Sequence, residues 1–175
     1  MTPETGKSPQ GTRLELVEQH VRYENAHDLE AVMETFSEEP YYDERPWGEH
    51  HAGLGAVREH YEQLFRAAPN LTIEILKRYV SRDAVILECE IRGTHLGIWR
   101  GLPPTGRQIR FSLCAVYTFT KADKLAGERV YYDRATVLTQ LGVLHDPESL
   151  LGRALTTITH PITLGRALFR RTRSR

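Results

Sequence analysis

The sequence has few cysteines and no long apolar run. Only two of its 175 residues are cysteines. Cys89 and Cys114 each lie in an apolar alternating segment, where a free thiol behaves as a small buried hydrophobe. No apolar run approaches the roughly 20 residues that span a bilayer. A disulfide framework, a cysteine metal site and a membrane-spanning helix are therefore not predicted.

The motifs of several large enzyme classes are also missing. The sequence has no internal repeat, no glycine-rich phosphate loop after a strand and no G-x-S-x-G nucleophile elbow. These absences argue against nucleotide binding and against hydrolysis by a serine triad. The first residues, MTPETGKSPQGT, lack the apolar core of a signal peptide, so the expected location is cytoplasmic.

The balance of charge is uneven along the chain. The 23 basic and 23 acidic residues give a formal net charge of zero. Residues 1–149 hold 17 of the basic and all 23 of the acidic residues, whereas residues 150–175 hold six arginines and no acidic residue. An acidic body therefore carries a basic tail.

The pattern divides the chain into three segments. Residues 1–11 are polar, contain two prolines and are predicted to be disordered. Residues 12–146 have regular apolar periodicity and form one domain of ordinary size. Residues 147–175 form a basic, amphipathic C-terminal tail with two short helices interrupted at Pro161.

Helices are expected before strands. A helix from Thr12 places Val17, His20, Val21 and Glu24 on one stripe, a second helix follows Asp28 as N-cap and includes Phe36, and a third covers 55–68. A short strand at 41–43 and a long loop lie between the second and third helices. Four strands follow at 71–80, 84–97, 107–120 and 124–133, with a helix over 135–141. This order indicates the α+β class, with helices covering one face of a curved antiparallel sheet.

Alternation along the last two strands suggests a cavity with one carboxylate. The odd-numbered positions of 111–119 form an almost continuous apolar row that includes Tyr117, and on the last strand Tyr131 shares a face with Asp133. We expect these faces to line a mostly apolar site with Asp133 as its titratable group. An Asp directly before a helix is also a strong N-cap. Asp133 therefore has two competing roles, helix cap or catalytic acid and base.

Other residues are candidates for ligand contact. His50 and His51 lie beside Glu49, but no H-x-H or H-x-x-x-H set accompanies them, so a place at the pocket mouth is favoured and no metal site is predicted. His95 is either a core residue or a ligand-binding residue. Asp43 either points into the cavity or forms a turn. Two aromatic residues are also candidates. Tyr61 lies on the apolar face of the third predicted helix, and Trp47 lies near a loop end, where large aromatic side chains often pack over the rim of a pocket.

Two motifs in the second half occur together. GTHLG leads through the turn GLPPTGR into the next strand, and YYD precedes a helix that carries QLG. Residues 93–142, which contain these motifs, resemble the corresponding segment of the SnoaL-like polyketide cyclases. The resemblance implies an α+β cone of the nuclear-transport-factor-2-like (cystatin-like) type, commonly dimeric, with a deep pocket. It also implies that the pocket aspartate, matched here by Asp133, acts as acid and base in an intramolecular aldol ring closure without metal or cofactor.

The expected function is thus that of a cofactor-independent cyclase or isomerase acting on a small apolar or aromatic carbonyl compound. A hydrolase using the same pocket and a non-catalytic small-molecule-binding protein of the same fold are the alternatives. A homodimer is expected, and nucleic-acid binding is not, because the basic residues cover one end of the chain and form no groove. The tail is expected to dock on the body or on a partner subunit, in preference to an anionic membrane surface.

Overall fold

The structure is a computed structural model and describes residues 9–145 and 148–159. Three helices and two strands occupy the first part of the chain: α1 (Pro9–Ala26), α2 (Leu29–Thr35), β1 (Phe36–Glu44), β2 (Glu49–Ala52) and α3 (Leu54–Ala67). The second part holds the long strands and the last two described helices: β3 (Thr72–Val80), β4 (Ala84–Thr94), β5 (Gln108–Phe119), β6 (Leu125–Tyr132), α4 (Arg134–Gln140) and α5 (Leu150–Thr159).

The six strands form one sheet in the order β2-β1-β6-β5-β4-β3. The consecutive strands β3 to β6 pair antiparallel, as expected. The expectation of a wholly antiparallel sheet is wrong at one pairing, because β1 runs parallel to β6. The long connection through β2, α3 and the meander returns the chain beside β1 in the same direction, and short-range alternation cannot reveal such a pairing.

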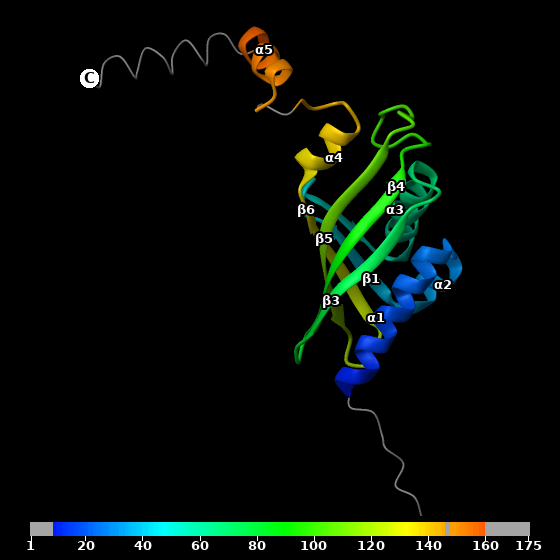
Figure 1. Cartoon of the computed structure of the whole chain (residues 1–175). Coiled ribbons are helices and arrows are strands. Elements are labelled where there is room, and N and C mark those ends of the chain that lie inside the picture. Colours follow the sequence, from blue (N-terminus) through cyan, green and yellow to red (C-terminus); the bar gives the residue numbers. More distant parts are fainter. Residues whose placement is uncertain (1–8, 146–147, 160–175) are drawn as a thin grey trace, which may run out of the picture.

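Helices α1, α2 and α3 cover one side of the curved sheet (Figure 1), which confirms the α+β class. Figure 1 shows α1, α2 and α3 on one side of the long strands, with α4 at the end of the sheet where β6 finishes. The main core lies between these layers and includes Val17, Val32, Val57, Leu87 and Val130.

Helix α1 confirms the expected stripe, because Val17, His20, Val21 and Glu24 are all buried. Its start differs from the prediction, since α1 begins at Pro9 and not at Thr12, and therefore includes residues 9–11 of the segment expected to be disordered. Proline fits the first turn of a helix, where its missing N–H costs nothing. The remainder of that segment, 1–8, lies outside the described residues.

The first two strands also differ from the expectation. Phe36 opens β1 instead of closing the second helix, and β1 is nine residues long. Pro40 lies where the β1–β6 register shifts between Phe36 and Tyr41, which is where a strand tolerates a residue without an N–H. Strand β2 falls in the segment expected to be a loop, because its four residues carry no apolar alternation.

The tail is described only as far as α5. Ile158, part of the expected apolar stripe, is exposed, so the described part of α5 does not bury that residue against the body. Docking on a partner subunit stays a prediction, and the second expected tail helix lies outside the described residues. Within the described ranges no helix has the length and apolar character needed to cross a membrane.

Candidate active site

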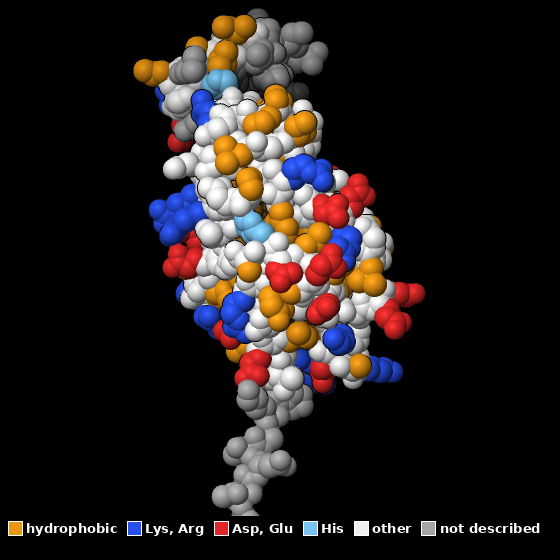
Figure 2. Space-filling view, turned by 90° about the vertical axis from the view of Figure 1, so that its right-hand side faces the viewer, with side chains coloured by type: hydrophobic (Ala, Val, Ile, Leu, Met, Phe, Trp, Pro, Cys, Tyr) orange, Lys and Arg blue, Asp and Glu red, His pale blue; other side chains and the backbone are white. Residues whose placement is uncertain are grey.

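A cavity of about 430 Å³ lies between the sheet and the helices. Its wall is mostly apolar and includes Leu64, Ile91, Phe111, Leu113 and Val130. A space of this size with a mostly apolar wall is typical of a site for a small organic ligand. Toward the end of the molecule that carries α4 and α5, apolar side chains gather on the face shown in Figure 2, while charged ones spread over the other end.

The cavity holds polar groups that have no internal partner. Within the described part of the chain, the buried side-chain nitrogen and oxygen atoms without a hydrogen bond are Oε2 of Glu24 and Nε2 of His51, His60 and His95. All four residues line the cavity. Buried polar atoms are almost always hydrogen-bonded, and an exception calls for a ligand, an ion or water. The unpaired atoms therefore make this cavity the candidate binding site.

One polar cluster, the inner cluster, consists of His20, Glu24, Tyr61 and Glu128. His20 and Glu24 are four residues apart on α1, so they occupy the same helix face, with His20 Nε2 3.8 Å from Glu24 Oε1. Tyr61 on α3 donates its hydroxyl to Glu128 Oε2 on β6 at 2.9 Å. The same hydroxyl lies 3.0 Å from His20 Nε2. Glu24 and Glu128 reach the cavity wall, and the other two residues support them from behind.

Burial shifts the proton affinities of this cluster. It raises the pKa of Glu24 to about 7, with His20 opposing the rise and the Glu128 carboxylate adding to it. Burial alone would lower the pKa of His20, but the Glu24 and Glu128 carboxylates outweigh it and the pKa is raised. A glutamate that titrates near neutral pH can both accept and return a proton under physiological conditions.

A second group, the outer cluster, consists of Glu44, His51, His60, Arg100 and Tyr132. Glu44, at the end of β1, accepts hydrogen bonds from Tyr132 and from the Arg100 guanidinium. The imidazoles of His51 on β2 and His60 on α3 pack against each other with ring centroids 4.7 Å apart. Burial lowers the pKa of His60 to about 3, with the charges of His51 and Arg100 adding to the effect.

His95 presents a donor to the cavity. Its Nδ1 accepts the backbone N–H of Thr105 at 3.2 Å, which assigns the ring proton to Nε2. Burial lowers the pKa of His95, so the ring stays neutral. Nε2 is buried and has no hydrogen-bond partner among the described residues.

Several residues expected from the sequence do lie at this site. Tyr117, His95 and His51 line the cavity. Tyr61 lies behind the wall in the inner cluster. Trp47 is not part of the wall, but its indole donates to the Tyr132 hydroxyl at 2.7 Å.

Four expected residues lie elsewhere, and Asp133 is the most important correction. Its carboxylate accepts the Ala135 N–H at 2.8 Å and the Thr136 hydroxyl at 2.6 Å, so it caps α4 on the surface. Tyr131 shares that outer face and is exposed. The register explains the error: Tyr117 pairs with Glu128, so the even-numbered residues of β6 face the cavity.

Asp43 and His50 are also outside the cavity wall. They bond each other, with His50 Nδ1 2.6 Å from Asp43 Oδ1, and Arg129 donates to the other Asp43 oxygen at 3.0 Å. Asp43 is therefore a buried ion-pair partner. Burial alone would raise the pKa of its carboxyl group, but the hydrogen bonds and charges of His50 and Arg129 outweigh burial and the pKa is lowered.

Sequence reasoning missed most of the charged site residues. His20 and Glu24 lay on the predicted stripe of the first helix, and a buried Glu on such a stripe was the available signal. Glu128 lies on the opposite face of the last strand from Tyr131 and Asp133, which were the residues predicted to face the cavity. His60 follows Val57 by three residues and precedes Leu64 by four, which puts it on the apolar side of α3. Glu44 is the last residue of β1, and Arg100 lies in the turn between Trp99 and Leu102, so periodicity gives no information on either.

Together, the fold and the cavity define an α+β protein with a mostly apolar cavity between sheet and helices. A sequence profile of the SnoaL-like polyketide cyclases matches residues 14–141, and the chain belongs to that family. The family confirms the resemblance carried by the GLPPTGR and YYD motifs. Comparison with curated protein sequences gives no significant match.

Solved structures share the fold. A proposed SnoaL-like polyketide cyclase from Jannaschia sp. CCS1 is 18% identical with a TM-score of 0.71, covering 79% of this chain and 97% of its own. A proposed polyketide cyclase from Acidithiobacillus ferrooxidans is 25% identical with a TM-score of 0.64, covering 78% and 98%. A Catenulispora acidiphila protein with a ketosteroid isomerase-like fold, bound to trimethylamine, is 19% identical with a TM-score of 0.62, covering 74% and 93%.

Proposed function

We propose that this protein is a cyclase-type enzyme that uses Glu24 as acid and base on a small, mostly apolar carbonyl compound. The observation that carries the proposal is the Glu24 carboxylate. Its Oε2 is buried, unpaired and part of the cavity wall, and its pKa is raised to about 7 by burial. Membership of the SnoaL-like polyketide cyclases supports ring closure as the reaction type.

The chemistry can proceed by proton transfer alone. A hydrogen on a carbon between or beside carbonyl groups is acidic enough for a carboxylate of raised pKa to remove. The resulting enolate attacks a second carbonyl of the same molecule, which the cavity holds close to it. A carbon–carbon bond forms, the attacked carbonyl becomes an alkoxide, and the protonated Glu24 returns its proton to that oxygen.

The other residues of the site have supporting roles in this proposal. Glu128 and His20 surround Glu24 and keep its proton affinity near neutrality. Burial raises the pKa of Tyr117 well above its usual value, so its phenol stays neutral and can donate to the enolate oxygen. His95 Nε2–H provides a second donor for a carbonyl group, and the apolar wall excludes water.

Hydrogen–deuterium exchange tests the proton-transfer step without knowledge of the natural substrate. An aryl ketone that fits the cavity exchanges its α-hydrogens slowly in buffered D₂O, and NMR should show faster exchange with the wild-type protein. Glu24→Gln should abolish the acceleration while retaining ketone binding. The rate should fall as the pH drops below about 7, because the base form of Glu24 is then lost.

Asp133→Asn is the matched control, since it removes the aspartate that the family resemblance assigns to catalysis. It should leave the exchange rate unchanged, because Asp133 lies outside the cavity. Loss of exchange in Asp133→Asn with retention in Glu24→Gln would reverse the assignment. If the wild-type protein binds the ketone without accelerating exchange, the site is a binding pocket and the proposal fails.

A further inference from the structure

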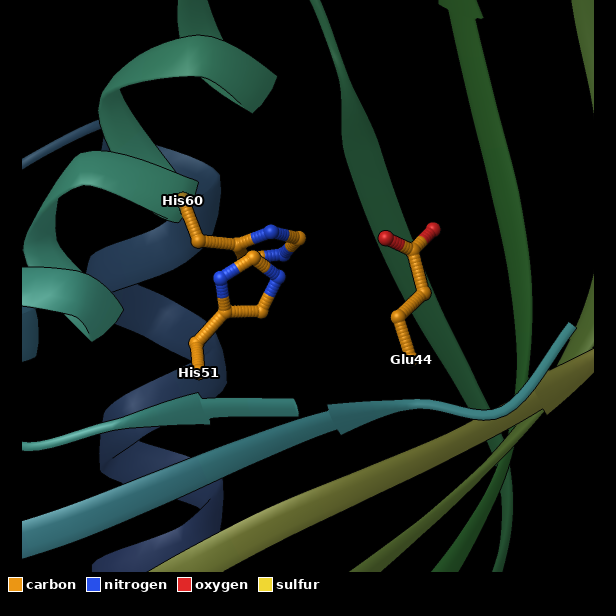
Figure 3. A group of neighbouring side chains, drawn as sticks. All are labelled: Glu44, His51 and His60. Atoms are coloured by element: carbon orange, nitrogen blue, oxygen red, sulfur yellow. The ribbon is translucent and has the colours of Figure 1, made fainter. Parts of the chain in front are cut away.

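The outer cluster contains a set of metal-ligand atoms that the proposed reaction does not use. One ligand atom each from Glu44, His51 and His60 lies within 4.8 Å of the other two. Figure 3 shows the two imidazoles side by side, one from β2 and one from α3, with the Glu44 carboxylate facing them. Three separate elements therefore direct one ligand each toward a common point.

One ring nitrogen of each imidazole has no hydrogen-bond partner in the described part of the chain. Nε2 of His51 and Nε2 of His60 are buried, and neither has a hydrogen bond within the described residues. A Glu49 carboxylate oxygen lies 3.4 Å from His51 Nε2, an ion-pair contact that is not a hydrogen bond. Two unpaired imidazole nitrogens beside a carboxylate are a costly arrangement without a ligand, because each buried polar atom loses its water.

We propose that Glu44, His51 and His60 bind one divalent first-row transition metal ion in the cavity wall. Two histidines and one carboxylate are the protein ligands of several catalytic zinc sites and of non-haem iron(II) sites. Three protein ligands leave at least one coordination position open, and here the cavity supplies the space for it. The ion would polarise a carbonyl oxygen of the bound compound.

The surroundings suit a cation. Glu44 and Glu49 contribute two negative charges near the site, and Arg100 bonds both of them and contributes one positive charge. The excess negative charge favours a divalent ion. The hydrogen bonds from Tyr132 and Arg100 to Glu44 do not exclude coordination, because carboxylate oxygens accept more than one partner and ligating carboxylates are commonly held in this way.

The ligand atoms require only a small adjustment. Zinc–ligand bonds of about 2.0–2.2 Å in tetrahedral geometry place the ligand atoms roughly 3.4 Å apart. The ligand atoms of Glu44, His51 and His60 now lie within 4.8 Å of one another, so metal binding requires them to approach by somewhat more than an ångström at most. Rotation of the two imidazoles can provide much of this, since no hydrogen bond to either Nε2 has to be broken.

The inner cluster is a poorer metal site despite its similar spacing. Its histidine, His20, has both ring nitrogens engaged, Nδ1 with Thr35 Oγ1 at 2.7 Å and Nε2 with the Tyr61 hydroxyl at 3.0 Å. A metal would have to displace one of these partners. The inner cluster is thus suited to proton transfer, and the outer cluster is suited to metal binding.

Metal binding can be measured on the full chain, produced without a polyhistidine tag and stripped with a chelator. Titration with Zn²⁺ should show one tight site per chain by calorimetry, and Co²⁺ should give the visible absorption of a low-coordinate site. His51→Ala and His60→Ala should each weaken Zn²⁺ binding at least about 100-fold, beyond what loss of an outer-shell partner costs.

His50→Ala is the matched control, because His50 is adjacent in sequence but lies outside the cavity wall and bonds Asp43. It should bind Zn²⁺ like the wild type. If His60→Ala does not fold, His51→Gln at a half-buried position replaces it in the test. Absence of a tight site in the wild type, or equal loss in His50→Ala and His51→Ala, overturns the proposal. Because the readout is metal binding, it is independent of the result with Glu24→Gln.

Discussion

Tyr61 and Glu128 join helix α3 to strand β6 through a buried hydrogen bond of 2.9 Å between their side-chain oxygens. The Tyr61 hydroxyl also lies 3.0 Å from His20 Nε2, so one phenol links the sheet with two helices. Three elements that are distant in sequence are thus held together at the cavity by a polar contact, in a core that is otherwise largely apolar.

Removing that hydroxyl should destabilise the protein. Tyr61→Phe leaves a Glu128 oxygen and a His20 nitrogen without this partner, and an unsatisfied buried polar group costs about 1–3 kcal/mol. The free energy of unfolding, measured in urea at neutral pH, should fall by that amount. Tyr131→Phe, the same change at an exposed position, should stay within about 0.5 kcal/mol of the wild type. Equal effects of the two changes would mean that the Tyr61 contact contributes nothing to stability.

Stability should also depend on pH through Glu24. Its pKa is about 7 in the folded protein, against the usual 4.5. Between these values the folded state binds more protons than the unfolded state, so stability falls as the pH rises from about 4.5 to about 7. The raised pKa of His20 acts in the same direction over its own range. The loss attributable to Glu24 is roughly 2–3 kcal/mol.

Urea unfolding at a series of pH values measures this slope. In Glu24→Gln the decline between about pH 4.5 and 7 should be much smaller, and at pH 8 the variant should be more stable than the wild type. Glu38→Gln, an exposed position on β1, should retain the wild-type slope. A Glu24→Gln variant with an unchanged slope would show that the glutamate titrates as it does in the unfolded chain.

The sequence predicts the elements well and the cavity-facing side of the last strand poorly. Alternation placed the odd-numbered row of β5 on the cavity side, because that row is almost wholly apolar. Strand β6 has tyrosines or charged side chains on both faces, so its alternation carries no sign of which face is inside. Only the pairing of Tyr117 with Glu128 decides it, and this pairing is set by the turn that joins the strands.

The charged residues of the site escape sequence reasoning for a related reason. Glu24, Glu44 and Glu128 lie on three elements. Glu44 and Glu128 each read alone as solvated side chains, and the stripe of the first helix gave a sign of burial only for Glu24. They are brought to one cavity by the parallel β1–β6 pairing and by the crossing of α1 over the sheet. The β1–β6 pairing joins segments about 85 residues apart, beyond the reach of local patterns.

Asp133 should matter for stability and not for chemistry. Asp133→Ala removes the acceptor for the Ala135 N–H and the Thr136 hydroxyl at the start of α4. We expect the melting temperature to fall by roughly a few degrees, as for loss of an N-cap. Hydrogen bonds from these groups lower the pKa of the Asp133 carboxyl, so its stabilising contribution is lost as the pH falls through that lowered pKa. Ketone exchange at neutral pH should be unaffected, and a large loss of exchange would contradict the position of Asp133 on the surface.

The glycines of the GTHLG motif and of α3 provide a final, paired prediction. A Cβ on Gly97 would lie 2.0 Å from the carbonyl oxygen of Arg66, and the Gly97 N–H donates to the Ala67 carbonyl at 3.0 Å. The loop after β4 therefore packs backbone to backbone against the end of α3, which keeps His95 at the cavity wall. Gly97→Ala must push these segments apart, and we expect a loss of at least about 2 kcal/mol.

Gly55, near the start of α3, is the opposite case. An added Cβ there meets no atom within 4 Å, and replacing a helical glycine by alanine stabilises by up to about 1 kcal/mol. Urea unfolding should therefore move in opposite directions for Gly97→Ala and Gly55→Ala. Ligand binding should weaken only in Gly97→Ala, because the strained loop carries His95 and borders the cavity. Binding equal to that of the wild type, together with unchanged stability, would show that the loop can move away from α3 at no cost.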